Sequence, residues 1–184
     1  MGVAPTGFKR AGQEPDKVVE KLEFANAPVT VAAVKVKKGL VEAGKKFSDD
    51  EDWLKYLTVR VKNISGKRVN YVSVLVVFTR PKNQDDSKEA PFGDSLRYGN
   101  STFSNPPSAG RAPAILPSET VYLTWDEHSY EVNLSVLQRL KYPKSLKKVE
   151  IYVEEVGFED GTVWSGGLFF RRDPNNPKKL IPAE

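Results

Sequence analysis

Residues 57–80, LTVRVKNISGKRVNYVSVLVVFTR, hold two consecutive β-strand patterns from which the fold class of the chain follows. In the first half, Leu57, Val59 and Val61 alternate with polar residues, which is the two-residue period of a strand with one buried face. In the second half, residues 71–78 are largely apolar in both alternating sets, so this strand is predicted to be covered on both sides. We therefore expect the second strand to lie in the middle of the structure.

Strand patterns recur along the rest of the chain, at residues 29–38, 115–125, 149–158 and 162–170. Asp160-Gly161, between the last two, is a strong hairpin signal because glycine adopts the positive φ that a tight turn needs. The apolar alternation skips from Val153 to Val156, which predicts a β-bulge near Glu154-Glu155. Gly166-Gly167 is expected to bend the last of these strands.

One segment has the period of a helix. In residues 129–140, SYEVNLSVLQRL, Val132, Val136 and Leu140 stand four apart, and Pro143 follows. The whole chain then gives about seven strands, one short inserted helix and no regular alternation of strand and helix, which disfavours a parallel sheet. We predict an all-β fold, a two-sheet antiparallel sandwich of immunoglobulin-like type, with an antiparallel barrel as the alternative.

The domain organisation follows from where the periodicity stops. Residues 1–16 are predicted to be a flexible leader, 17–172 the sandwich domain and 173–184 a tail that lies on its surface. Within the domain, residues 81–114 contain five prolines and three glycines and lose the strand period, so they are expected to form a long, ordered but irregular loop.

Composition excludes several classes of function. The 28 basic residues are offset by 24 acidic ones and interspersed with them, which argues against a nucleic-acid partner. The chain has no cysteine, so disulfides and thiolate metal sites are excluded. No run approaches the ~18 apolar residues of a membrane span. The leader lacks the apolar core of a signal peptide, so a location outside the cytoplasm would require that a signal has been removed, and a cytoplasmic location stays open.

No catalytic, metal or cofactor site is predicted. His128 is the only histidine, so a histidine-dependent triad would have to use it, and its place ahead of the helix is typical of a loop or cap residue. Residues 49–52, four consecutive carboxylates, lack the spacing of a calcium loop and are interpreted as a solvated acidic loop. Glu154, Glu155, Glu159 and Asp160 resemble a glycosidase carboxylate set, but the bulge and the hairpin account for them. The chain is therefore expected not to be an enzyme.

Aromatic residues are the candidate binding groups, because they give large contact area at low entropic cost. The predicted partner-binding residues are in or near the long loop: Phe92, Leu96, Arg97, Tyr98 and Phe103. Trp125 and Trp164 could stack on sugars, but their strand patterns favour packing in the core.

Two stretches resemble a known family. Residues 59–78, VRVKNISGKRVNYVSVLVVF, and 115–125, ILPSETVYLTW, are similar to bacterial immunoglobulin-like domains of secreted proteins and lipoproteins, with Pro117-Ser118-Glu119 in place of the usual Pro-Gly-Glu turn. The C-terminal stretch 153–180 is similar to uncharacterised bacterial envelope proteins. The resemblance covers about half of the chain, and it implies a non-enzymatic domain located outside the cytoplasm.

The function expected from these observations is binding. The preferred hypothesis is a structural or binding module of the bacterial envelope that presents the 81–114 loop to a protein partner. The alternative is a carbohydrate-binding module that uses Tyr98 and a tryptophan.

Overall fold

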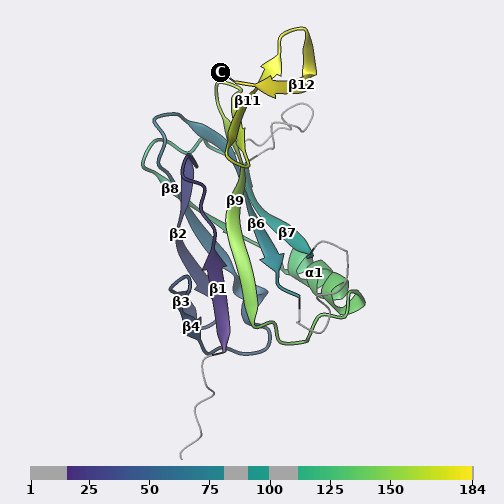
Figure 1. The fold of residues 1–184 in the computed structure, drawn as a ribbon. Coiled ribbons are helices and arrows are strands. Elements are labelled where there is room, and N and C mark those ends of the chain that lie inside the picture. The colour runs from purple at the N-terminus through teal and green to yellow at the C-terminus, as the bar shows by residue number, and fades with distance from the viewer. Residues whose placement is uncertain (1–15, 81–90, 100–111, 184) are drawn as a thin grey trace, which may run out of the picture.

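The computed structural model describes residues 16–80, 91–99 and 112–183. Two β-sheets stack face to face, with one helix at one end (Figure 1). The prediction of an all-β, two-sheet, mostly antiparallel sandwich is confirmed. The described residues form twelve strands rather than about seven, because several are short and the C-terminal region adds two hairpins.

The larger sheet has eight strands. It is centred on β9, which pairs along its length with β6, and β6 pairs on its other side with β7. On the far side of β9, β1 and β4 extend one half of the sheet and β10, β11 and β12 the other. Its strands are β1 (Lys17–Lys21), β4 (Lys46–Phe47), β6 (Val69–Phe78), β7 (Gly93–Gly99), β9 (Lys148–Phe158), β10 (Val163–Ser165), β11 (Leu168–Asp173) and β12 (Asn176–Pro182). The β1–β9 pair is parallel, an exception to the antiparallel pattern.

The smaller sheet has four strands in the order β3-β2-β5-β8, all antiparallel. They are β2 (Val29–Val36), β3 (Gly39–Val41), β5 (Thr58–Asn63) and β8 (Thr120–Thr124). Burial alternates along β5, with Val59 and Val61 fully buried between the sheets, as the sequence period predicts.

The two strands of residues 57–80 lie in different sheets: β5 in the smaller and β6 in the larger. The crossing between them is fixed by Asn63, which is fully buried. Its amide donates to the carbonyls of Lys67 (2.8 Å) and Ile115 (3.0 Å), and its oxygen accepts from the backbone N–H of Ser65 (3.0 Å). The central position predicted for the second strand is confirmed, since β6 lies between β7 and β9.

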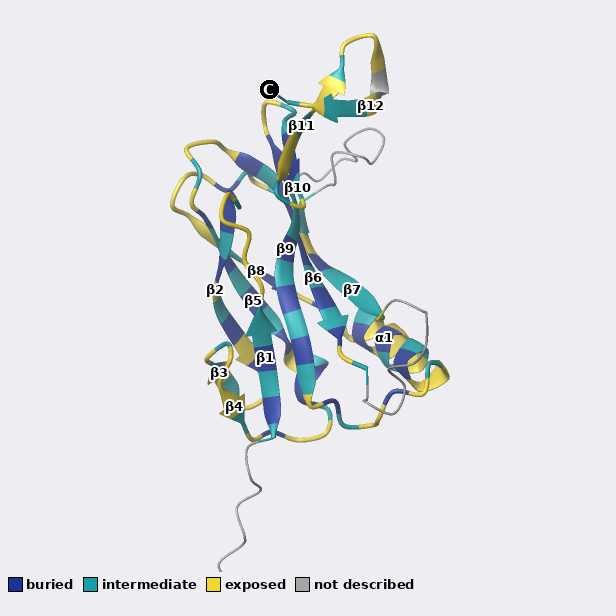
Figure 2. Cartoon of the chain, viewed as in Figure 1, coloured by how far each residue is buried: buried dark blue, intermediate teal, exposed yellow. Residues whose placement is uncertain are grey.

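The helix α1 (Glu127–Arg139) confirms the predicted helical segment. Asp126 caps it by accepting from the backbone N–H of Ser129 at 2.7 Å. Tyr130 and Leu137 are buried and join the core, while the opposite side of the helix is exposed (Figure 2). A 3₁₀ helix, η1 (Trp53–Tyr56), precedes β5, and its Trp53 donates from Nε1 to the Leu146 carbonyl at 2.8 Å.

The bulge predicted near Glu154-Glu155 is confirmed. Ser73 pairs with Glu155 and Val74 with Val153, so Glu154 is the extra residue, and both glutamates point to the outside of the sheet. The hairpin at Asp160-Gly161 is confirmed too, with Gly161 at a φ of +83°.

The C-terminal region differs from the prediction. Gly166 and Gly167 do not bend one strand but reverse the chain in a two-residue turn between β10 and β11, which their positive φ angles (56° and 92°) allow. Residues 173–184, expected to be a tail lying on the surface, contribute β12, which pairs with β11 in a hairpin that extends beyond the sandwich (Figure 1).

The segment 81–114, expected to be an irregular loop, contains a regular strand. β7 spans Gly93–Gly99 and pairs with β6 over its whole length. Glycines at both ends and nearby prolines hid its alternation. No helix in the part of the chain that the structure describes is long and apolar enough to cross a membrane.

Candidate functional site

Three of the predicted partner-binding residues pack toward the core. Leu96 is buried opposite Val74 of β6. Tyr98, on the same side of β7, is partly buried, and its hydroxyl donates to the Pro113 carbonyl at 2.8 Å. Phe92 stacks on Phe78 with ring centroids 5.4 Å apart. These side chains attach the segment to the sandwich.

Of the same set, Arg97 points outward and is exposed. It lies next to Ser73 in the sheet. Phe103 is outside the described residues.

The three tryptophans of the chain, Trp53, Trp125 and Trp164, are buried. Trp125 stacks on Phe78 at 6.1 Å, and Trp164 meets Phe24 edge to face at 5.5 Å. The expectation that Trp125 and Trp164 pack in the core is confirmed, and a tryptophan platform for sugars is not available on the surface.

The outer side of the larger sheet, here called the A face, combines apolar side chains with carboxylates that already have partners. Its residues are Tyr71, Ser73, Leu75, Val77, Ser95, Arg97, Glu150, Tyr152, Glu154 and Glu155. Glu154 accepts from the hydroxyls of Ser73 (2.8 Å) and Ser95 (3.0 Å). Leu75, Val77 and Tyr152 are partly exposed on neighbouring strands.

The electrostatics of the A face are set by burial and by ion pairs. Burial raises the pKa of the Tyr71 and Tyr152 hydroxyls. Lys148, at the β1 side of this face, pairs with Glu20 (2.6 Å) and Glu150 (3.0 Å), and its hydrogen bond to Glu20 above all raises its pKa.

The outer side of the smaller sheet, here called the B face, has a different composition. Its outward residues are Thr30, Ala33, Lys35, Leu40, Thr58, Arg60, Lys62, Thr120, Tyr122 and Thr124. Tyr122 is 64% exposed and lies opposite Arg60 in the sheet. A groove of about 570 Å³ runs along this face, lined by Ala33, Lys35, Leu40, Thr58, Arg60 and Tyr122.

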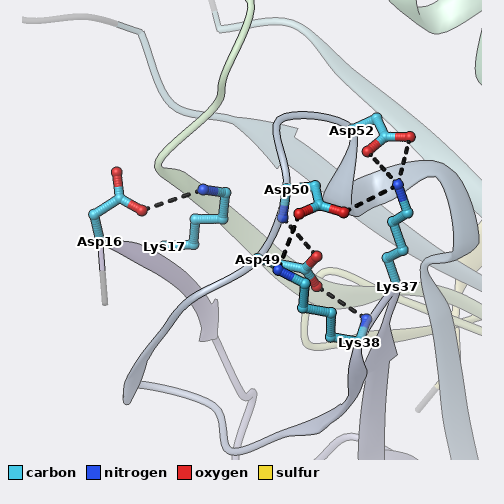
Figure 3. Close-up of polar contacts among 7 residues, drawn as sticks. All are labelled: Asp16, Lys17, Lys37, Lys38, Asp49, Asp50 and Asp52. Atoms are coloured by element: carbon cyan, nitrogen blue, oxygen red, sulfur yellow. Dashed lines mark hydrogen bonds and ion pairs between the residues drawn. The ribbon is translucent and has the colours of Figure 1, made fainter. Parts of the chain in front are cut away.

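The acidic loop of residues 49–52 is held by two lysines (Figure 3). Lys37 contacts Asp52 (2.7 Å) and Asp50 (3.2 Å), and Lys38 contacts Asp50 (2.9 Å). Hydrogen bonding to Lys38, and then to Lys37, lowers the pKa of Asp50.

The interpretation of residues 49–52 as a solvated acidic loop is wrong at one residue, Asp49. Its side chain is fully buried and accepts from the backbone N–H groups of Lys38 (3.0 Å) and Asp50 (2.7 Å). Four consecutive acidic residues give no sequence signal for which of them is buried, so the inward position of Asp49 was not predicted. These contacts make the loop a structural connection between β2 and η1.

The other sequence candidates have structural positions. His128 is exposed in the first turn of α1, and Asp160 accepts from the backbone of Thr162 in its turn. Glu159 pairs with Arg68. Within residues 16–80, 91–99 and 112–183, no group of three or more histidine, aspartate or glutamate side chains is arranged to hold a metal ion.

Comparison with known proteins does not assign this chain to a family. No protein-family model matches the chain, and no curated protein matches it. A crystal structure of a hypothetical protein from Peptoclostridium difficile 630 is similar over 77% of this chain and 87% of that one, with 12% identity and a TM-score of 0.40.

The B face was missed by the sequence reasoning. Its signal was present, since the polar positions of residues 58–62 and 120–124 include arginine, lysine and tyrosine but no carboxylate. Only the register of β5 with β8 shows that they share one surface.

Proposed function

We propose that this chain is a non-enzymatic binding module of the bacterial cell envelope, an immunoglobulin-like sandwich that holds a protein partner through its A face. The observation that carries the proposal is the outward apolar group of Leu75, Val77 and Tyr152 beside the exposed Arg97. The surface includes part of the 81–114 segment, because Arg97 and Ser95 belong to β7.

The composition of the A face suits a protein interface. Such interfaces have an apolar centre, are enriched in tyrosine and arginine, and concentrate their binding energy in a few such residues. The carboxylates of this face, in contrast, already have partners: Glu154 accepts two serine hydroxyls, and Glu150 pairs with Lys148. A partner that covers them would therefore leave few charges without compensation.

The test is affinity capture from the envelope fraction of the source bacterium, read by mass spectrometry and followed by measurement of affinity for the captured protein. Leu75→Glu should weaken binding about 30-fold or more, the effect of an unpaired charge in a desolvated interface. Arg97→Glu, at an exposed position where folding is not at risk, should weaken it in the same direction.

Thr58→Glu on the B face is the matched control and should leave capture unchanged. Capture by the wild type and by both A-face variants alike would show that this face is not the interface. Capture of nothing would contradict a protein partner.

A further inference from the structure

The B face carries charges of one sign. Among its outward side chains, the ionised ones are Lys35, Arg60 and Lys62, all basic. Carboxylates at the rim of this face have partners: Glu23 accepts from the Thr30 hydroxyl (3.0 Å) and pairs with Lys21 (2.8 Å), and Glu42 pairs with Lys45 (2.8 Å).

These three cations have no ion-pair partner among the described residues, whereas Lys37, Lys38 and Lys148 all have one. Cations without a partner inside the protein are available to a ligand that carries negative charge. The face is therefore complementary to an anion.

The cations follow a diagonal line over the sheet. Lys62 and Arg60 are successive outward residues of β5, and Lys35 lies one row further on, on β2, paired with Thr58. Successive outward positions on a strand are about 7 Å apart, so the line suits a linear chain with repeated negative groups. The groove of about 570 Å³ contains the Arg60 and Lys35 end of this line, with Tyr122 on one side and Leu40 on the other.

We propose that the B face binds a linear acidic polysaccharide, a glycan chain that bears carboxylate or phosphate groups. Lys35, Arg60 and Lys62 contact the anionic groups, and the Tyr122 ring stacks on the face of one sugar. The threonine oxygens accept hydrogen bonds from sugar hydroxyls.

Two other polyanions fit less well. Single-stranded nucleic acid is held by stacking successive bases on several rings, and the B face has one outward ring, Tyr122. An acidic protein segment would require an apolar centre, and the outward residues of β2, β5 and β8 are mainly threonine, alanine and basic residues. This proposal does not depend on the protein partner of the A face.

The test is binding of the full chain to fluorescently labelled polygalacturonate and to poly(glycerol phosphate), with neutral dextran, poly-glutamate and an oligo(dT) of similar length for comparison. We expect binding to one or both acidic polymers that exceeds binding to dextran at least tenfold. The two acidic polymers distinguish a carboxylate from a phosphate ligand.

Variants locate the site. Tyr122→Ala should weaken binding about tenfold, and Tyr122→Phe should restore most of it, because the ring and not the hydroxyl makes the stacking contact. Lys35→Ala, at an exposed position, and Arg60→Ala should each weaken it severalfold or more. Arg171→Ala removes an exposed arginine of β11 away from this face and should leave the affinity unchanged.

Several results would overturn the proposal: equal binding to dextran, tighter binding to oligo(dT) or poly-glutamate, absence of binding to both acidic glycans, or an effect of Arg171→Ala as large as that of Lys35→Ala.

Discussion

The A face and the B face are both built from β-strands, but most charged side chains of the A face have partners within the protein, whereas those of the B face do not. On the A face, Glu154 is held by two serine hydroxyls, and Lys148 lies between Glu20 and Glu150. On the B face, Arg60 and its neighbouring lysines have no such partner among the described residues. The A face also presents apolar side chains, whereas outward threonines dominate the B face.

This difference separates charges that support the fold from charges that are available to a ligand. Exposed ion pairs stabilise a protein little, but they do use the charges that a ligand could otherwise contact. A protein partner can desolvate a surface of paired charges and apolar residues at low cost. A surface with unpaired cations attracts a hydrated polyanion instead.

The salt dependence of ligand affinity should show the largest difference between the two faces. Three cations on a linear polyanion predict a slope of log affinity against log salt of roughly −2, so tenfold more NaCl weakens binding about 100-fold. Binding of a protein partner through the A face should change by less than about threefold, because its energy is mainly apolar. Titrations of both ligands at 50 and 500 mM NaCl measure the two slopes. A steep slope for the protein partner, or a flat one for the glycan, would contradict the assignment of the faces.

The next largest difference is expected in how much a substitution on each face lowers the free energy of unfolding. Glu154→Ala removes two hydrogen bonds to a charged acceptor, so the free energy of unfolding should fall by about 1–2 kcal/mol. Lys62→Ala on the B face should change it by no more than about 0.5 kcal/mol, because the ammonium supports nothing in the fold. Urea unfolding of both variants beside the wild type gives the comparison. A larger loss for Lys62→Ala than for Glu154→Ala would reverse our reading of which charges are structural.

The smallest effect is expected at alkaline pH. The pKa of Lys148 is raised in the folded protein, chiefly by Glu20, so its pairing stabilises the fold fully below the usual lysine pKa of 10.5. This contribution is lost as the pH rises above 10.5 and through the folded pKa. The thermal unfolding temperature of the wild type should therefore fall slightly more between pH 9 and pH 12 than that of Lys148→Met. Lys148→Arg, which stays charged, is the control, and identical pH profiles for wild type and Lys148→Met would show that the pair contributes nothing.

The strand periodicity carried much of the fold prediction. The alternation in residues 57–63, the doubly apolar run in 71–78 and the three-residue step at Val153–Val156 each have a local physical cause, and each was confirmed in the structure. β7 escaped because its alternation is short and bounded by glycines, so its pairing with β6 supplies the order that its own sequence does not indicate.

The candidate sites were harder to predict, because a side chain's direction depends on its strand's place in the sheet. Tyr98 and Leu96 looked available in a polar, proline-rich stretch, but the register with β6 turns both of them toward the core. Tyr122 looked like one more alternating residue, and its register with Arg60 places it on the B face.

The sequence by itself determined the strands of the central region, the presence of the helix, the bulge near Glu154 and the hairpin at Asp160-Gly161, since these depend on residues a few positions apart. Only the tertiary structure decided that β5 and β6 belong to different sheets, that Asp49 folds inward, and that Lys35, Arg60, Lys62 and Tyr122 meet on one surface. Such relations join residues far apart in the chain through hydrogen-bond register and burial, and no local period encodes them.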